Sequence, residues 1–217
     1  MTTTKKISVF SIVLFAGILF IACNNNDKKG PTSTNKDSSK PATKKEEKKK
    51  ADEQYKRPPI VNIVDTLAPK RLVAYSKDSA ANFDRIALKL GNIYGVKLQE
   101  YIKKNNLKTT GAPMAWYTKQ KAPYFFEAGF PVNKAGAKAV AGVQIREMNA
   151  GKAVIAHFFG PFDLLPQGYD AIREFIKDNK KSIAGIPYEI YLTDPFDKNG
   201  KPVDPYKIQT DIVFPIK

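Results

Sequence analysis

The sequence predicts an α+β domain built from two similar modules in tandem, each with two strands, a helix and two more strands. Three observations support this prediction: a repeated phrase, the same order of strand and helix periodicities in both halves, and a globular composition that begins at residue 58. Residues 111–117 (GAPMAWY) return as residues 185–191 (GIPYEIY), and residues 127–132 (EAGFPV) return as residues 211–216 (DIVFPI). A duplicated unit usually forms a pseudo-symmetric domain whose halves share a core and meet at a cleft.

The first copy covers about residues 58–133. Runs rich in β-branched and aromatic residues, separated by short turns, predict its strands. Between them, apolar residues recur at steps of three and four from Phe83 to Ile102, which is the spacing of an amphipathic helix. The predicted strands are residues 60–64, 71–75, 112–118 and 124–132.

The second copy covers about residues 137–217 and repeats this order. Its helix follows Gly160-Pro161, places Leu165 to Ile176 on one apolar face, and has Pro166 in the first turn, where a missing backbone donor is tolerated. Segments that mix hairpins with helices predict antiparallel sheet with helices packed on it. The predicted strands are residues 139–147, 152–159, 188–192 and 207–216.

Residues 1–23 have the features of a bacterial lipoprotein signal. Two lysines precede an apolar run at residues 7–21, and Cys23, the only cysteine, follows a small residue. The run is short for a membrane span of about 20 residues. We expect cleavage before Cys23 and a lipid anchor there; the alternative is an uncleaved anchor or a buried free thiol. In some bacteria an Asp directly after the lipidated cysteine resembles a signal that retains a lipoprotein in the inner membrane, but residue 24 is Asn. We therefore expect the protein at the outer membrane of the cell envelope, facing the periplasm or the cell surface.

Residues 24–57 have almost no large apolar side chains and are dense in Lys, Asn, Ser and Thr. Such a segment buries too little apolar surface to fold, so we expect a disordered tether. The formal net charge of the chain is +15, and the run at residues 44–50 (KKEEKKK) suits anionic headgroups, nucleic acid or a solvated spacer. The sequence shows no helix-turn-helix pattern. We expect a monomer that meets the membrane through its lipid and has no nucleic-acid partner.

Several motifs in the second copy resemble one family. They are the phrase at residues 185–191, Asp-Pro pairs at residues 194–195 and 204–205, residues 210–216 (TDIVFPI), and residues 157–162 (HFFGPF). In order and spacing they resemble the GyrI-like small-molecule-binding family, the effector-binding domain of multidrug-responsive transcription activators and gyrase-inhibitory proteins. The resemblance covers about residues 58–217.

The resemblance implies tandem strand-helix-strand-strand (SHS2-like) modules that form a curved sheet around a central pocket. It also implies a ligand that is cationic or aromatic and is held around an acidic residue, and Glu189 matches the pocket glutamate. Some relatives are implied to hydrolyse strained electrophiles. We expect no DNA-binding domain in this chain, so the regulatory output of the activators is not expected to apply to it.

Glu189 stands where the first copy has Ala115, so only one copy supplies a carboxylate. Burying a carboxylate costs several kcal/mol unless it is paired, and a bound cation with aromatic faces would offset that cost. Alternatively, the aromatics are ordinary core and Glu189 pairs with a Lys or Arg at the sheet edge. The candidate ligand-binding residues are Glu189, Tyr191, Trp116, Tyr117, Phe126, Phe158 and Tyr94.

Other ionisable residues give weaker indications. Glu127 and Asp211 occupy equivalent places in the two copies, either as a second acid in the pocket or at strand positions near solvent. The only histidine, His157, has no cluster of ligand-type residues at metal-binding spacing, so we expect neither a metal nor a cofactor.

Two functions of different classes remain, and both use the same pocket. The first is a tethered module that binds a small molecule. The second is a hydrolase in which Glu189 acts as general base while Tyr191 or Tyr117 orients the substrate. The sequence offers no second assured carboxylate or histidine partner, which favours binding. A structural envelope protein without a ligand is a third interpretation.

Overall fold

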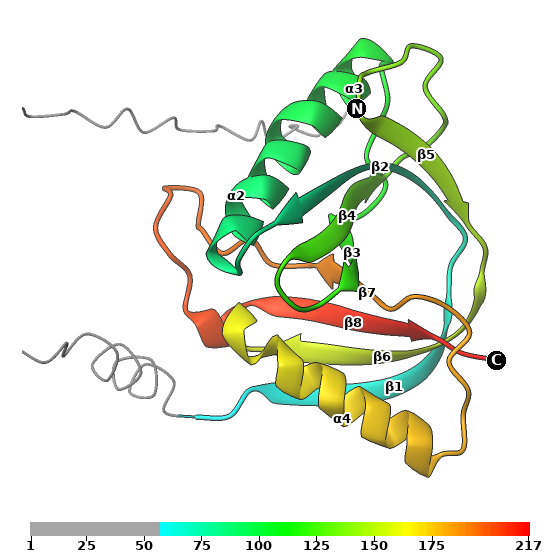
Figure 1. The fold of residues 1–217 in the computed structure, drawn as a ribbon, viewed down its shortest axis with the longest axis vertical. Helices are drawn as coiled ribbons and strands as arrows, with labels where there is room; N and C mark the ends of the chain where they lie inside the picture. Colours follow the sequence, from blue (N-terminus) through cyan, green and yellow to red (C-terminus); the bar gives the residue numbers. More distant parts are fainter. Residues whose placement is uncertain (1–56) are drawn as a thin grey trace, which may run out of the picture. The chain divides into compact units, whose positions relative to one another are not determined.

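One antiparallel sheet of eight strands organises the domain (Figure 1). The computed structural model describes residues 57–217. The predicted lipoprotein signal at residues 1–23, and the predicted tether at residues 24–57 except its last residue, lie outside the described residues. The strands are β1 (Ile60–Ala68), β2 (Arg71–Ala80), β3 (Met114–Lys119), β4 (Tyr124–Pro131), β5 (Val143–Met148), β6 (Gly151–Phe159), β7 (Tyr188–Tyr191) and β8 (Gln209–Pro215).

The strand order is β1-β6-β8-β7-β3-β4-β2-β5. It places β3 and β7 side by side at the centre and leaves β1 and β5 at the edges. Each edge strand pairs with a strand from the other half of the chain, β1 with β6 and β5 with β2. If β1 to β4 are exchanged in turn with β5 to β8, the strand order read from one edge becomes the order read from the other edge.

Both helical segments cover the same face of the sheet. The first consists of α2 (Asp84–Asn92), a π-helical turn (Ile93–Lys97) and α3 (Leu98–Lys104), so the helix predicted at residues 83–102 is confirmed, with a π-turn in its middle. The second is α4 (Leu165–Asp178), which follows a 3-10 turn. The α2–α3 segment packs over β2 and β4, and α4 packs over β1, β6 and β8 (Figure 1).

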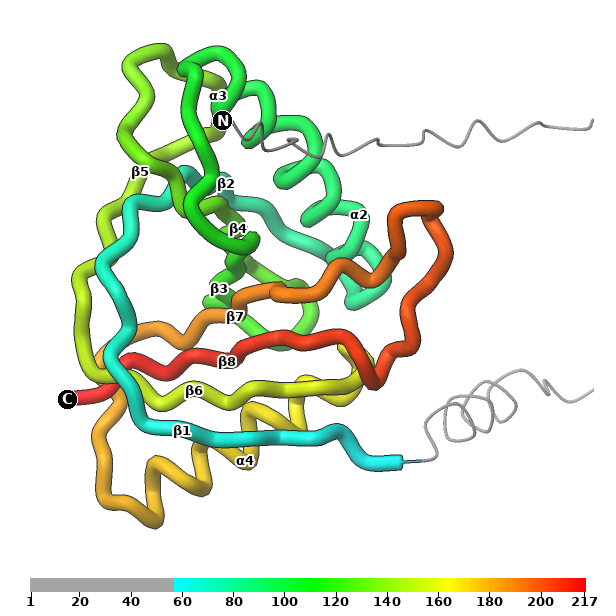
Figure 2. Tube along the Cα trace, turned by 180° about the vertical axis from the view of Figure 1, so that it is seen from behind, coloured from blue at the N-terminus to red at the C-terminus, as the bar shows by residue number. Residues whose placement is uncertain are grey.

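Three apolar clusters hold these layers together. One lies under α2–α3, including Phe126 and Ile93, and one lies under α4, including Phe158 and Ile172. The third lies on the face of the sheet without helices, around Trp116. Figure 2 shows the chain bending around this side of the sheet between β1 and β2 and between β5 and β6.

The structure corrects several predicted strand boundaries. The first two strands run on to Ala68 and Ala80 instead of ending at residues 64 and 75, and β3 begins at Met114 rather than at residue 112. Residues 139–142 were predicted to begin a strand, but they form a turn in which Gly142 has a φ of 75°, and β5 begins at Val143. The last strand begins at Gln209 rather than at residue 207. A 3-10 turn (Pro205–Lys207) precedes it, because the Asp204 side chain accepts a hydrogen bond from the backbone N–H of Tyr206.

Within residues 57–217, we find no helix whose length and apolar character would suit a membrane crossing.

Close packing of β4 against β2 leads to a stability prediction. A Cβ atom at Gly129 would lie 2.7 Å from the Ala74 carbonyl oxygen and 2.7 Å from Val73 Cγ1. Gly129→Ala should therefore lower the free energy of unfolding by about 1–3 kcal/mol in a urea titration.

Gly91→Ala is the matched control, because a Cβ there meets nothing within 4 Å. It lies in α2, where Ala is favoured over Gly by about 1 kcal/mol, so this variant should be as stable as wild type or more stable. Equal stability of the two variants would contradict the close approach of β4 to β2.

Candidate ligand-binding site

The central pair of strands places Glu189 opposite Ala115. β3 and β7 pair through only two residue pairs, Met114 with Ile190 and Ala115 with Glu189. Ala115 and Glu189, which occupy the same place in the repeated phrase, are therefore neighbours on paired strands. Both residues are buried, with 4% of Glu189 exposed. The carboxylate lies on the face of the sheet that carries the helices, because its hydrogen-bond partner Tyr169 comes from α4.

Two tyrosine hydroxyls donate to the Glu189 carboxylate. Tyr169 Oη lies 2.9 Å from Oε1, and Tyr191 Oη lies 2.7 Å from Oε2. The hydroxyls of Tyr117 and Tyr191 are 3.1 Å apart. Because Tyr191 uses its only proton toward Glu189, Tyr117 is the donor in this second bond. A chain of donors thus runs from Tyr117 through Tyr191 to the carboxylate.

Aromatic rings from both helical segments surround Tyr191. Tyr94 lies in the π-helical turn, and its ring packs edge-on against Tyr191 with centroids 6.5 Å apart. Its hydroxyl donates to the backbone oxygen of Met114 at 2.7 Å. Phe162, just before α4, packs edge-on against the other side, with centroids 6.0 Å apart. We call Glu189 with Tyr94, Tyr117, Tyr169 and Tyr191 the tyrosine cluster.

Tyr169 was not among the sequence-predicted site residues. It reaches Glu189 because α4 lies very close to the sheet at Gly168, where a Cβ atom would come within 2.7 Å of Ile212 Cδ1 and 2.9 Å of Phe158 Cδ2. The sequence contained one indication of it. A phenol on the apolar face of an otherwise well-formed amphipathic helix needs a buried polar partner.

Burial determines the electrostatics of the cluster. It raises the pKa of Glu189 from 4.5 to about 7, although the hydrogen bonds from Tyr191 and Tyr169 act in the opposite direction. Burial also raises the pKa of Tyr94, Tyr117, Tyr169 and Tyr191, so all four remain protonated donors. Glu189 forms no ion pair with any residue in 57–217, so the alternative that pairs it with a Lys or Arg finds no support there.

The other predicted aromatics divide between two faces. Phe126 packs against the ring of Tyr117 at 5.8 Å between centroids, and Phe158 lies fully buried under α4. Trp116 does not join the cluster. Strand neighbours point to opposite faces, so Trp116 lies on the face without helices, and its ring packs against Tyr188 at 5.7 Å.

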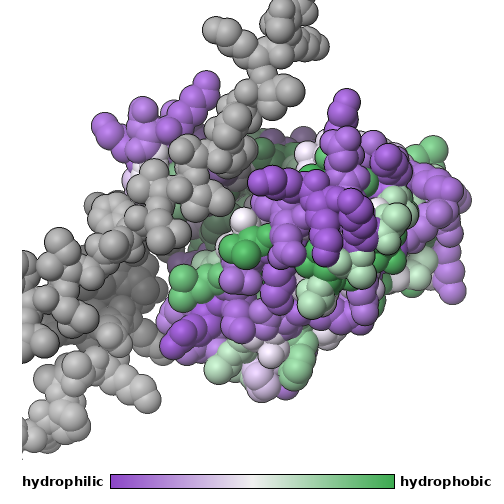
Figure 3. Space-filling view, turned by 90° about the horizontal axis from the view of Figure 1, so that it is seen from above, coloured by the Kyte–Doolittle hydropathy of each residue, from purple (hydrophilic) through white to green (hydrophobic). Residues whose placement is uncertain are grey.

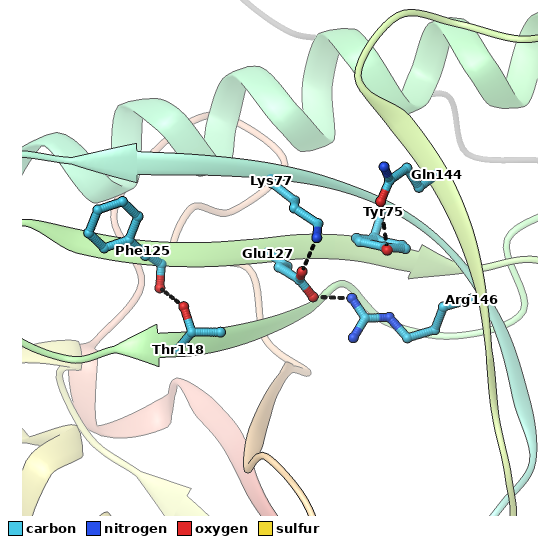
Figure 4. A network of polar contacts seen from close by, with 7 residues as sticks. All are labelled: Tyr75, Lys77, Thr118, Phe125, Glu127, Gln144 and Arg146. Carbon is cyan, nitrogen blue, oxygen red and sulfur yellow. Dashed lines mark hydrogen bonds and ion pairs between the residues drawn. The ribbon is translucent and has the colours of Figure 1, made fainter.

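Glu127 and Asp211 also lie on the face without helices. Glu127 binds Arg146 and Lys77, and the Arg146 guanidinium lies beside Tyr75 (Figure 4). The same guanidinium also lies over the Trp116 ring. Burial alone would raise the pKa of Glu127, but the hydrogen bonds from Arg146 and Lys77 hold it below its ordinary value.

Asp211 accepts hydrogen bonds from His157 at 2.8 Å and from Gln209 at 3.0 Å, and it is buried. Neither Glu127 nor Asp211 is therefore a second acid beside Glu189. Asp211 does not lie near solvent either. No group of three or more metal-ligating side chains occurs among the described residues.

The chain belongs to the GyrI-like family: the family's model, described as a GyrI-like small molecule binding domain, matches residues 66–217. The resemblance found in the sequence is therefore confirmed at the level of the family. A search of curated proteins found no significant match.

Solved structures share the fold. The C-terminal domain of EcmrR is 22% identical with a TM-score of 0.60, over 73% of this chain and 98% of that domain. EcmrR in its DNA complex is 21% identical with a TM-score of 0.61, over 80% of this chain. A protein described as a hydrolase from Listeria innocua is 14% identical with a TM-score of 0.50, over 80% of this chain and 98% of that one. At these identities the likeness shows the fold alone, and this chain spans only 62% of the length of EcmrR.

The raised pKa of Glu189 predicts a pH-dependent stability. Its protonated form is favoured by the fold, so its contribution is complete below pH 4.5 and falls by about 3 kcal/mol as the pH rises to about 7. Glu189→Gln keeps the shape and cannot ionise. In urea titrations, the unfolding free energy of wild type should therefore fall relative to that of this variant as the pH rises from 4.5 to about 7.

Glu127→Gln is the control, because the pKa of Glu127 is lowered and its contribution has the opposite sign. That contribution is present above pH 4.5 and is lost as the pH falls. Parallel stability curves for wild type and Glu189→Gln would show that the Glu189 carboxylate is solvated rather than buried.

Proposed function

We propose that the protein binds a small cationic or aromatic compound at the tyrosine cluster, while a lipid on Cys23 holds it at the outer membrane. In this proposal the two halves are a tandem duplication, and the site is asymmetric because only the second half supplies an acid. The single observation that carries the proposal is the buried Glu189 carboxylate without a counter-ion among the described residues.

A bound cation would complete the electrostatics of this site. Two hydroxyl bonds are incomplete compensation for a buried charge, and an uncompensated buried carboxylate costs several kcal/mol. A cation at Glu189 would gain the direct charge interaction. The faces of Tyr94, Tyr117 and Tyr191 would add roughly 0.5–2 kcal/mol each through cation–π contact. An aromatic ligand would stack on the same rings, so both ligand classes suit the cluster.

A hydrolase would use the same carboxylate as a general base toward water. A pKa of about 7 suits a general base. Both oxygens of Glu189, however, accept hydrogen bonds from tyrosines, and its contacts in the described domain include no histidine or second carboxylate. This arrangement favours binding over turnover.

The proposed anchor rests on the sequence of residues 1–23 alone. A cell that expresses the full chain with an alkyne-tagged fatty acid should label the protein, and Cys23→Ser should abolish the label and release the protein from the membrane fraction. Labelling that survives Cys23→Ser would refute the anchor without affecting the ligand proposal.

A matched pair of ligands tests the role of Glu189. N-methylquinolinium and quinoline have nearly the same shape, but only the first is charged at neutral pH. Hydrogen bonds and contacts to a buried charge contribute about 1.5–3 kcal/mol, so Glu189→Gln should weaken binding of the cation by about tenfold to a hundredfold. Binding of neutral quinoline should change little. Isothermal titration calorimetry measures both.

Glu127→Gln is the control variant, because it removes a carboxylate from the opposite face and should leave both affinities unchanged. Equal losses in the two variants would contradict the site. If wild type hydrolysed an activated ester and Glu189→Gln still bound that ester without hydrolysing it, the result would support a hydrolase instead of a binding protein.

A further inference from the structure

Five exposed lysines gather at one end of the domain, where α3 ends and the following strands return. They come from the last turn of α3, the segment after it, and the loop between β4 and β5. Figure 3 looks down on the domain from this side and shows a largely hydrophilic surface with smaller apolar areas. We call this set the lysine cap: Lys103, Lys104, Lys108, Lys134 and Lys138.

Hydrogen bonds fix the loop of the lysine cap to α3. The Asn105 amide nitrogen donates to the backbone oxygens of Tyr101 at 3.0 Å and Lys138 at 2.8 Å, and its oxygen accepts from the Lys138 N–H at 2.7 Å. The Gly136 N–H donates to Tyr101 Oη at 2.8 Å. The exposed lysines therefore start from a firmly held backbone, and Lys104 Nζ itself donates to the Ala139 oxygen.

The charge of the lysine cap is not balanced by the domain itself. Elsewhere on the domain, lysines pair with acids, as Lys77 does with Glu127 and Lys181 with Asp65. No lysine of the cap has an ion pair within residues 57–217, and Glu100, the acid nearest to it in α3, forms none. A surface of one sign of charge attracts an extended polyanion.

The composition of the loop favours a membrane over a nucleic acid. Small apolar residues, Ala135, Ala137 and Ala139, alternate with the lysines, and all three are exposed. The loop between residues 133 and 140 carries no aromatic side chain on which bases would stack. Near an anionic leaflet, each lysine contributes about 1 kcal/mol of attraction. We infer that the lysine cap docks the domain on a membrane surface of anionic phospholipids.

This docking is separate from ligand binding. The tyrosine cluster lies at the β3–β7 centre of the sheet and shares no residue with the lysine cap. The proposed tether between Cys23 and residue 57 would reach roughly 110 Å when fully extended, at about 3.3 Å per residue. An anchored chain would therefore leave the domain free to turn its lysine cap toward the leaflet.

A site-specific fluorescent probe distinguishes docking of the cap from attachment by the rest of the chain. Cys23 is the only cysteine, so Cys23→Ser with Ala137→Cys leaves one position for an NBD label in the cap. The full labelled chain is mixed with vesicles of phosphatidylglycerol and phosphatidylcholine, or of phosphatidylcholine alone. The label should shift to the blue only on the anionic vesicles. A label at Asn199→Cys, in an exposed loop, should not shift on either.

Neutralising the cap should weaken docking by about fivefold per lysine. Lys104 is kept, because it donates to the Ala139 oxygen at 3.0 Å. The cap variant combines Lys103→Gln, Lys108→Gln, Lys134→Gln and Lys138→Gln. The charge-matched control combines Lys152→Gln, Lys177→Gln, Lys198→Gln and Lys201→Gln.

Circular dichroism checks that both variants are folded. A label at position 137 that stays in water on anionic vesicles would overturn the inference, as would equal weakening by the two variants. If the lysine cap bound a DNA duplex more tightly than the anionic vesicles, its partner would be a nucleic acid and the inferred membrane docking would be wrong.

Discussion

Burial of the Glu189 carboxylate is the constraint around which the rest of the structure is arranged. The carboxylate is buried at the centre of the sheet, and its hydrogen-bond donors are the hydroxyl groups of Tyr169 and Tyr191. Hydroxyl donors moderate the cost of the charge without cancelling it. Part of the desolvation cost of the Glu189 carboxylate therefore remains uncompensated in the domain by itself.

Each half of the chain contributes to this arrangement in a different way. The first half supplies Tyr94 and Tyr117 and places the small side chain of Ala115 across from the acid. The second half supplies the acid and Tyr191 on β7 and brings α4 close to the sheet. The two faces of the sheet also differ in their chemistry. On the face without helices, Glu127 pairs with Arg146 and Asp211 with His157, whereas Glu189 on the helical face has no basic partner within residues 57–217.

Most strands and both helices were predictable from the sequence, because apolar residues recur with different periods in strands and helices. The repeated phrase puts Ala115 and Glu189 in equivalent places, but their pairing depends on the order of the strands in the sheet, which the phrase does not give. Tyr169 was not predictable, since its contact depends on how closely α4 approaches the sheet at Gly168. The prediction that Trp116 lines the site was wrong, because side chains alternate along a strand and Trp116 follows Ala115, which faces Glu189.

The exchange of edge strands has a mechanical consequence. The halves touch at the centre through two residue pairs only, yet β1 is held by the second half and β5 by the first, each along an entire ladder. Each half therefore holds the edge strand of the other half in its own part of the sheet. Small sliding at the centre can alter the spacing of the tyrosines, whereas full separation requires two outer ladders to be unzipped first. Even a cut in the connecting loop would leave the two pieces joined.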